Sequence, residues 1–257
     1  MNLSVNLKAN QRALEIDLIR GIALFLMLLD HLAFDLRYFL NCDGLAFVDS
    51  SFFLDIVRPS VLVFFLLASG ISTAFSRSDL IHARRIGIAA IGLSLVSFAV
   101  EAILQLGFII YFNVLHVICL ALLLRALFAQ LFARLGRIGM DLCLIFVSGL
   151  FAVYISQYQT LENYSFLSLI LGFRSDSLPE MADYLSLFPW AIFIYLGALI
   201  GDLYYPKSES EKGYLISSQK PAAFFIWLGQ YPLWVYLIHQ PIFLAIVYLL
   251  KLILQKH

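Results

Sequence analysis

The chain has 257 residues, of which 62% are hydrophobic and only 13% are charged, and its formal net charge is zero. A soluble domain carries about a quarter charged residues, so this composition excludes a soluble protein and predicts an integral membrane protein in a lipid bilayer, with no nucleic-acid partner. The apolar runs are long and lack the alternation of barrel strands, which predicts an all-α, polytopic transmembrane helix bundle. Because seven spans of about 20 residues fill more than half of the chain, residues 1–257 are expected to form one integral membrane domain.

The first predicted span, Ile16 to Leu40, combines the length of a membrane helix with several ionisable residues. Ten residues lie between Arg20 and His31, which is about three helical turns, so their side chains share one face about 16 Å apart. Asp17 and Asp35 extend the same face at helical spacing. Polar groups at membrane depth are costly and usually mark a functional site. The alternative is a hydrogen-bonded cluster that only fixes helix packing.

The remaining apolar runs predict six further spans. Their approximate bounds are Phe52–Phe75, Ile86–Leu106, Phe108–Phe128, Ile138–Tyr158, Tyr184–Tyr205 and a final run that begins at Phe224. The final run is expected to be one span, kinked near His239 to Pro241 and preceded by a short helix at the membrane surface. Dividing it into two would give eight spans. The apolar segment at 165–173 is too short to cross and is expected to be re-entrant or interfacial.

Basic residues gather in alternate connections, which predicts a cytoplasmic amino terminus. The basic set follows spans two, four and six and consists of Arg77, Arg84, Arg85, Arg134, Arg137, Lys207, Lys212 and Lys220. The acidic set follows spans one, three and five and includes Asp43, Asp49, Glu162 and Asp176, while Lys8 and Arg12 precede the first span. Lysine and arginine collect on the cytoplasmic side of membrane proteins, so the carboxyl terminus is expected outside.

Three histidines from different spans, His31, His116 and His239, are expected at similar depth in the middle-to-outer half of the membrane. Histidine suits proton transfer near neutral pH, and a neighbouring carboxylate can orient it. Asp35, one turn beyond His31, is expected to do so. Asp30 points about 100° away and is expected to face a different helix or substrate hydroxyls. The alternative for each histidine is a hydrogen-bonded core residue.

Several other kinds of site are not expected. No His-x-x-x-His or Cys-x-x-Cys spacing occurs, so a metal site is not predicted. The chain also lacks a Gly-x-Ser-x-Gly elbow, a phosphate loop and a dinucleotide fingerprint. Its three cysteines are too scattered for a disulfide framework. The cytoplasmic arginines suit a phosphorylated cosubstrate, although the positive-inside rule explains most of them equally well.

Four segments together resemble the bacterial heparan-α-glucosaminide N-acetyltransferase-like membrane proteins. The segments are EIDLIRGIALFLMLLDHLAFDL, VRPSVLVFFLLASGIS, FNVLHVICLALLL and WVYLIHQPIF. The spacing of Arg20 and His31 and the YLIH segment are also distantly similar to the acyltransferase-3 membrane family.

The resemblance implies an enzyme that moves an acetyl group from cytosolic acetyl-CoA to an amino sugar or other glycan acceptor outside a bacterial inner membrane. His31 would be the catalytic base, with an acetyl carrier as the less favoured alternative, and Asp30 and Asp35 would lie beside it. The residues expected at the acetyl-CoA end are Arg20, Asp17, Arg84 and Arg85. The residues expected on the acceptor side are Arg58, Asn113, His116, His239 and Gln240.

Two other classes of function remain open. One is a small proton-coupled transporter or flippase in which Asp30 and the three histidines form a proton relay. No inverted repeat is visible in the pattern of spans, which disfavours that class. The other is a non-catalytic accessory subunit of an envelope pathway, in which the polar residues serve packing alone. The sequence leaves the acceptor and the oligomeric state open.

Overall fold

The computed structural model describes residues 14–76, 78–105, 109–157, 165–173, 181, 183–205 and 220–254, and this part of the chain contains helices and no strand. The longer helices are α1 (Leu14–Phe39), α2 (Arg58–Ile71), α3 (Asp79–Leu104), α4 (Val114–Leu131), α5 (Gly136–Gln157), α7 (Ala191–Tyr204) and α9 (Pro232–Leu254). The shorter ones are α6 (Phe166–Leu171), α8 (Lys220–Gln230) and the short 3-10 or π-helical segments η1 (Asp43–Asp49), η2 (Phe53–Val57), η3 (Ser72–Phe75) and η4 (Ala133–Leu135).

The predicted membrane helix bundle is confirmed. Five helices are long and apolar enough to cross a membrane: Phe53–Phe75, Asp79–Ile103, Val114–Leu131, Ala133–Gln157 and Pro232–Leu254. Helix α1 has 26 residues but carries six acidic or basic ones, and α7 has only 14 residues, about 21 Å of helix. The number of spans and the cytoplasmic side stay predictions. Several charges behind the orientation lie outside the described residues: Lys8, Arg12, Arg77, Glu162, Asp176, Lys207 and Lys212.

Large apolar side chains cover the outer surface of the bundle. On α3, Ile103 is 78% exposed, and on α5, Phe146 is 67% exposed. Apolar patches of this extent are rare on soluble monomers and are expected where hydrocarbon replaces water. The helix faces that carry these side chains are therefore the lipid-facing ones.

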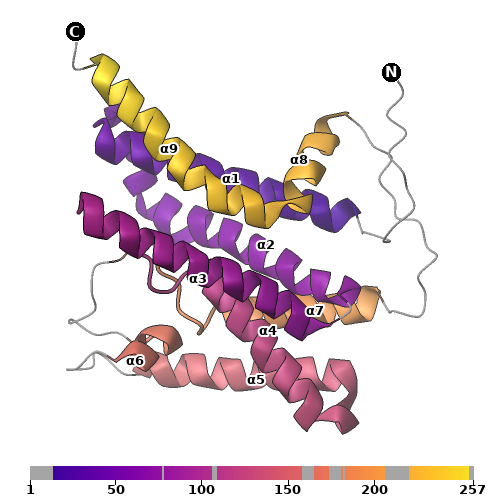
Figure 1. The fold of residues 1–257 in the computed structure, drawn as a ribbon. Coiled ribbons are helices and arrows are strands. Elements are labelled where there is room, and N and C mark those ends of the chain that lie inside the picture. The colour runs from indigo at the N-terminus through magenta and orange to yellow at the C-terminus, as the bar shows by residue number, and fades with distance from the viewer. Residues whose placement is uncertain are drawn as a thin grey trace.

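The helices form a closed arrangement around an apolar core. Helix α1 packs against α2, α8 and α9, and α2 packs against α7. Helix α4 contacts α3, α5 and α7, and α3 contacts α9. Figure 1 shows α1, α8 and α9 along one side of the molecule, α4, α5 and α7 along the other, and α2 and α3 between them. Leu122 of α4 and Ile194 of α7 are fully buried in this core.

Glycines allow α2 and α7 to touch backbone to backbone. A Cβ atom on Gly70 would lie 2.1 Å from the Ile194 carbonyl oxygen, and one on Gly197 would lie 2.2 Å from the Leu67 carbonyl oxygen. Small residues in facing positions permit such a close approach of two membrane helices. Gly229 of α8 approaches α1 in the same way, 1.8 Å from the Asp17 carbonyl oxygen by the same measure.

Three helices begin at other residues than predicted. Helix α3 begins at Asp79 rather than near Ile86, because the polar residues before the apolar run are themselves good helix formers. Helix α4 begins at Val114 rather than Phe108 because the Asn113 side chain caps it. Helix α7 begins only after Pro189, which supplies no backbone N–H for a preceding helical turn.

The final apolar run is a short helix followed by one helix long and apolar enough to span a membrane, as expected. Helix α8 ends at Gln230, and α9 begins at Pro232 and continues through Pro241. Proline is favoured in the first turn of a helix, where its missing N–H costs nothing. Helix α8 packs along α1. The segment at 165–173 contains the six-residue helix α6, too short to cross, as expected.

Candidate functional site

A cavity of about 490 Å³ lies among α1, α2, α4, α9 and the segment that leads into α7. Most of its wall is apolar, with Leu26, Leu62 and Phe65 as examples. Its ionisable members are Asp30, His31, Arg58, Asp183, Tyr184 and Tyr236. Small-molecule sites commonly have this size and this combination of an apolar wall with a few polar groups. The cavity is therefore the candidate functional site.

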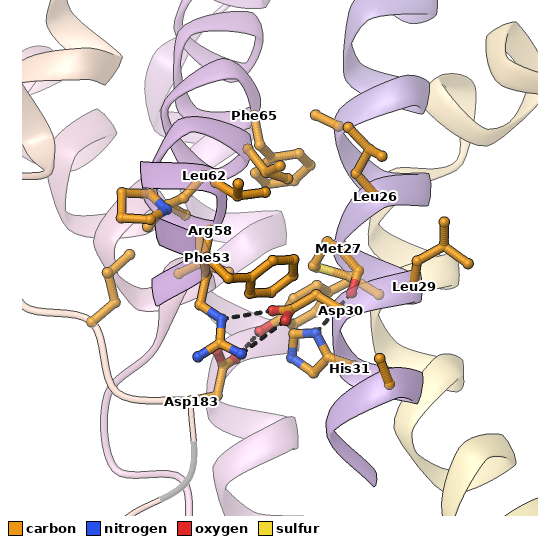
Figure 2. Close-up of a pocket in the computed structure, with 18 of the residues that line it drawn as sticks. Leu26, Met27, Leu29, Asp30, His31, Phe53, Arg58, Leu62, Phe65 and Asp183 are labelled. Carbon is orange, nitrogen blue, oxygen red and sulfur yellow. Dashed lines mark hydrogen bonds and ion pairs between the residues drawn. The ribbon is translucent and has the colours of Figure 1, made fainter. Parts of the chain in front are cut away.

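His31 lies on the cavity wall with one ring nitrogen fixed by the backbone. Its Nδ1 lies 2.9 Å from the Met27 carbonyl oxygen, one turn earlier in α1 (Figure 2). A carbonyl oxygen only accepts hydrogen bonds, so Nδ1 carries the proton, and in neutral His31 the lone pair is on Nε2. The residue that orients the ring is thus Met27 and not Asp35, as the sequence had indicated.

Asp30 and Arg58 form a two-point ion pair beside His31. Arg58 Nε lies 2.9 Å from Asp30 Oδ2, and Arg58 Nη2 lies 2.8 Å from Asp30 Oδ1 (Figure 2). The guanidinium carbon is also 5.8 Å from the centre of the Phe53 ring. Asp30 was expected to face a different helix, and it faces the amino-terminal end of α2. The pair brings a predicted catalytic residue and a predicted substrate-binding residue into one cavity wall.

Asp35 and its partners lie behind His31, outside the cavity lining. Asp35 is 1% exposed, and its carboxylate accepts from Gln240 Nε2 at 3.2 and 3.4 Å. His239 Nδ1 lies 2.6 Å from the Tyr236 carbonyl oxygen, and the His31 and His239 rings meet edge to face with their centres 5.1 Å apart. These contacts hold α9 against the stretch of α1 that carries His31.

Asn113 and His116 form the cap of α4 and do not line the cavity. Asn113 Oδ1 accepts the backbone N–H of Leu115 at 3.2 Å, and His116 Nδ1 accepts the backbone N–H of Asn113 at 3.3 Å. Such a reciprocal cap satisfies backbone donors that the helix leaves unpaired. Asn113 Nδ2 also donates to the Tyr236 hydroxyl at 3.2 Å, which links the cap to the cavity wall.

The four residues expected at the acetyl-CoA end divide into two pairs. Arg20 donates to the carbonyl oxygens of Gly229 at 3.2 Å and Ala68 at 3.1 Å, and its Nη1 lies 3.5 Å from Asp17 Oδ1. Arg20 therefore joins α1 to α2 and α8. By contrast, Arg84 and Arg85 are exposed in the first turns of α3.

Ion pairs and a hydrogen bond join the end of α1 to the segment η1 that follows it. Arg37 Nη1 lies 2.7 Å from Asp43 and its Nε lies 3.2 Å from Asp49, which also accepts the Tyr38 hydroxyl at 2.8 Å. The Tyr38 hydrogen bond and the Arg37 guanidinium hold the pKa of Asp49 below its usual value. These contacts fix η1, whose Phe47 lines the cavity.

Asp183 and Tyr236, which were not among the predicted site residues, line the same cavity. The Tyr236 hydroxyl donates to the Asp183 carboxylate, and Figure 2 shows Asp183 pointing into the region lined by Arg58, Asp30 and His31. Tyr236 lies three residues before His239, on the same helical face, and that spacing could have revealed it. Asp183 precedes α7, and no pattern around it signals its position.

A buried ionic cluster around Arg125 was also not predicted. Arg125 is 1% exposed and pairs with Asp141 at 2.7 and 3.0 Å and with Asp202 at 2.8 Å. Its remaining nitrogen donates to Asp79, and Arg137 binds Asp202 at 2.7 Å. Helices α3, α4, α5 and α7 each contribute a charged residue to the cluster. The sequence pattern that could have predicted it is one charged residue in each of several apolar helices, all at the same end of the bundle.

A largely apolar cavity with a few polar groups, set among apolar helices, defines the class as a polytopic membrane protein with a site between its helices. The chain belongs to the family described as heparan-alpha-glucosaminide N-acetyltransferase, catalytic, whose model matches residues 12–241. The match contains the whole cavity lining, confirms the predicted family, and indicates membrane acetyltransferase activity. No curated protein and no solved structure matches the chain.

Proposed function

We propose that the protein transfers an acetyl group from cytosolic acetyl-CoA to an amine or hydroxyl of an extracytoplasmic amino sugar or glycan, in a bacterial inner membrane. The observation that carries this proposal is His31, a base with its Nε2 lone pair on the wall of the cavity, beside the Asp30–Arg58 pair. Membership of the acetyltransferase family supports the reaction class.

The cavity residues suit the proton transfers of acetyl transfer. His31 Nε2 takes the proton of the attacking amine or hydroxyl. The acceptor nitrogen or oxygen forms a bond to the acetyl carbonyl carbon, the carbon–sulfur bond of the thioester breaks, and His31 returns the proton to the thiolate. Arg58 Nη1, which has no hydrogen bond to any described residue, is available to stabilise the oxyanion or to bind the acceptor. Asp30 holds the guanidinium in place.

The positions of the basic residues support a donor site and an acceptor site at different depths of the bundle. Acetyl-CoA, when bound, supplies the thioester. Arg84 and Arg85 are exposed at the predicted cytoplasmic end, and their guanidinium groups suit phosphates. His31 lies about 16 Å along α1 from Arg20. The contacts of Arg20 and Asp17 support a role in stabilising this end of the bundle.

The test is binding and turnover of labelled acetyl-CoA by purified protein in detergent, with glucosamine as the probe acceptor. Wild type is expected to bind saturably and to release CoA. His31→Gln is expected to lower turnover about a hundredfold or more while acetyl-CoA binding changes little. The matched control is His82→Gln, because His82 lies on α3 outside the cavity lining, and its turnover is expected to stay near that of wild type.

Each adverse outcome identifies a different error. If wild type fails to bind millimolar acetyl-CoA, the acetyltransferase proposal is wrong. Proton-dependent uptake into vesicles would then support the transporter, and a stably co-purifying partner would support the accessory subunit. If His31→Gln turns over acetyl-CoA like wild type, the reaction stands but His31 is not its base.

A further inference from the structure

Asp183 is a second carboxylate on the cavity wall, supplied by the segment before α7 and not by a helix. The side chain reaches the cavity from a backbone with φ of 52°. That left-handed conformation is uncommon for residues other than glycine, and aspartate tolerates it better than most. A backbone of this kind persists where surrounding contacts determine it.

Two buried side chains, Tyr236 and Asn113, hold the Asp183 carboxylate through a chain of hydrogen bonds. The Tyr236 hydroxyl of α9 donates to Asp183 Oδ2, and Asn113 Nδ2 donates to the Tyr236 oxygen at 3.2 Å. Tyr236 is 4% exposed and Asn113 is fully buried, and Asn113 is itself held by the first turn of α4. The carboxylate therefore rests on a rigid chain of hydrogen bonds and has little freedom to turn away from the cavity.

The charges of the cavity wall do not balance. Asp30 and Arg58 neutralise each other through two hydrogen bonds. Asp183 has no arginine or lysine within ion-pair distance among the described residues, and Tyr236, its hydrogen-bond donor there, is neutral. Asp183 is exposed, so its carboxylate is accessible to a ligand, and among the described acidic residues of the cavity wall it is the one without a basic partner. Such a site favours a bound cation and disfavours an anion.

We propose that Asp183 is the specificity-determining residue that binds the acceptor as a protonated amine, in preference to a neutral hydroxyl or an anionic acceptor. This inference rests on the proposed acetyl transfer, since it concerns the acceptor of the same cavity. Tyr236 and Asn113 are positioning residues that hold the carboxylate. The bound ammonium first loses one proton to solvent. The neutral amine then attacks the thioester carbon, His31 Nε2 takes the second proton from the nitrogen as the carbon–sulfur bond breaks, and that proton passes to the leaving thiolate.

The test compares Asp183→Asn with Asp55→Asn, a matched change of an exposed carboxylate in η2 that does not line the cavity. Probe acceptors are glucosamine and glucose, which differ in the amine. Asp183→Asn is expected to raise the glucosamine KM about tenfold or more, because one charge-assisted hydrogen bond is lost. The KM for acetyl-CoA and kcat are expected to change less than about threefold, and Asp55→Asn is expected to match wild type.

Direct binding separates this inference from the acetyltransferase proposal. Labelled glucosamine is titrated into the protein without acetyl-CoA, and Tyr236→Phe serves as a second variant that keeps the carboxylate. Weaker binding in Asp183→Asn, with a smaller loss in Tyr236→Phe, supports the inference even if no turnover is found. If wild type acetylates glucosamine and Asp183→Asn keeps its glucosamine KM, the inference is wrong and the acetyltransferase proposal stands. Equal binding of glucose and glucosamine by wild type would also overturn it.

Discussion

At the scale of residues, the geometry of Arg58 matters as much as its charge. Two parallel hydrogen bonds to Asp30 use the planar guanidinium, which an ammonium cannot reproduce. Arg58→Lys keeps the positive charge but loses the two-point pair and leaves Asp30 poorly satisfied. We expect turnover to fall about tenfold or more, measured as CoA release at saturating acetyl-CoA.

The control for Arg58→Lys is Arg134→Lys, which makes the same change at an exposed site in η4. Turnover of this control is expected to equal that of wild type. If Arg58→Lys is as active as wild type, charge alone is sufficient at this position, and the two-point geometry has no role in the reaction.

At the scale of elements, the close contact between α2 and α7 requires glycine, which has no side chain, at positions 70 and 197. A Cβ atom on Gly70 would meet a backbone oxygen at 2.1 Å, so Gly70→Ala forces the helices apart. This change displaces the segment of α2 that follows Arg58. We expect a loss of about 1–3 kcal/mol in stability, the usual range for overpacking, seen as a lower Tm in detergent.

Gly92→Ala on α3 provides the matched control, since a Cβ atom there meets no atom within 4 Å. Alanine is the better helix former by about 1 kcal/mol, so this variant is expected to have an unchanged or raised Tm. Equal effects of the two substitutions would mean that helix propensity, and not the contact between α2 and α7, determines the result.

At the scale of the whole molecule, the Arg125 cluster connects four helices at the end opposite the cavity. Arg125 contacts Asp79, Asp141 and Asp202, so Arg125→Met leaves buried carboxylates without their cation. Removing one partner of a buried ion pair costs about 3–5 kcal/mol. We expect a large fall in Tm and in the yield of folded protein, while Arg134→Met, at an exposed position, is expected to have little effect.

A double variant distinguishes the loss of charge balance from the loss of packing. Replacing both members of a buried pair by apolar residues is often nearly neutral, so Arg125→Met with Asp141→Leu is expected to recover part of the lost Tm. No recovery would show that Arg125 contributes through its other two carboxylates or through its shape.

The sequence by itself determined the class of the protein, the family and most of the helices. Hydropathy and low charge are properties of local segments, and the bilayer requires each apolar segment to be helical whatever its neighbours are. The bounds of α1 and α5 were therefore close to those predicted. The start of α4 was misplaced because Asn113 was not recognised as the residue that caps it.

Only the tertiary structure decided which polar residues share a site. The sequence indicated His31, Asp30 and Arg58 separately, but their meeting in one cavity depends on how α1 packs against α2. The same packing gave Asp35, His116 and His239 partners outside that cavity. Asp183 and the Arg125 cluster became visible only in three dimensions. Whether two charges pair depends on the distance between residues on different helices, and the spacing of residues along one helix does not give that distance. Whether a segment prefers lipid or water depends on its own composition, so the sequence is sufficient to predict it.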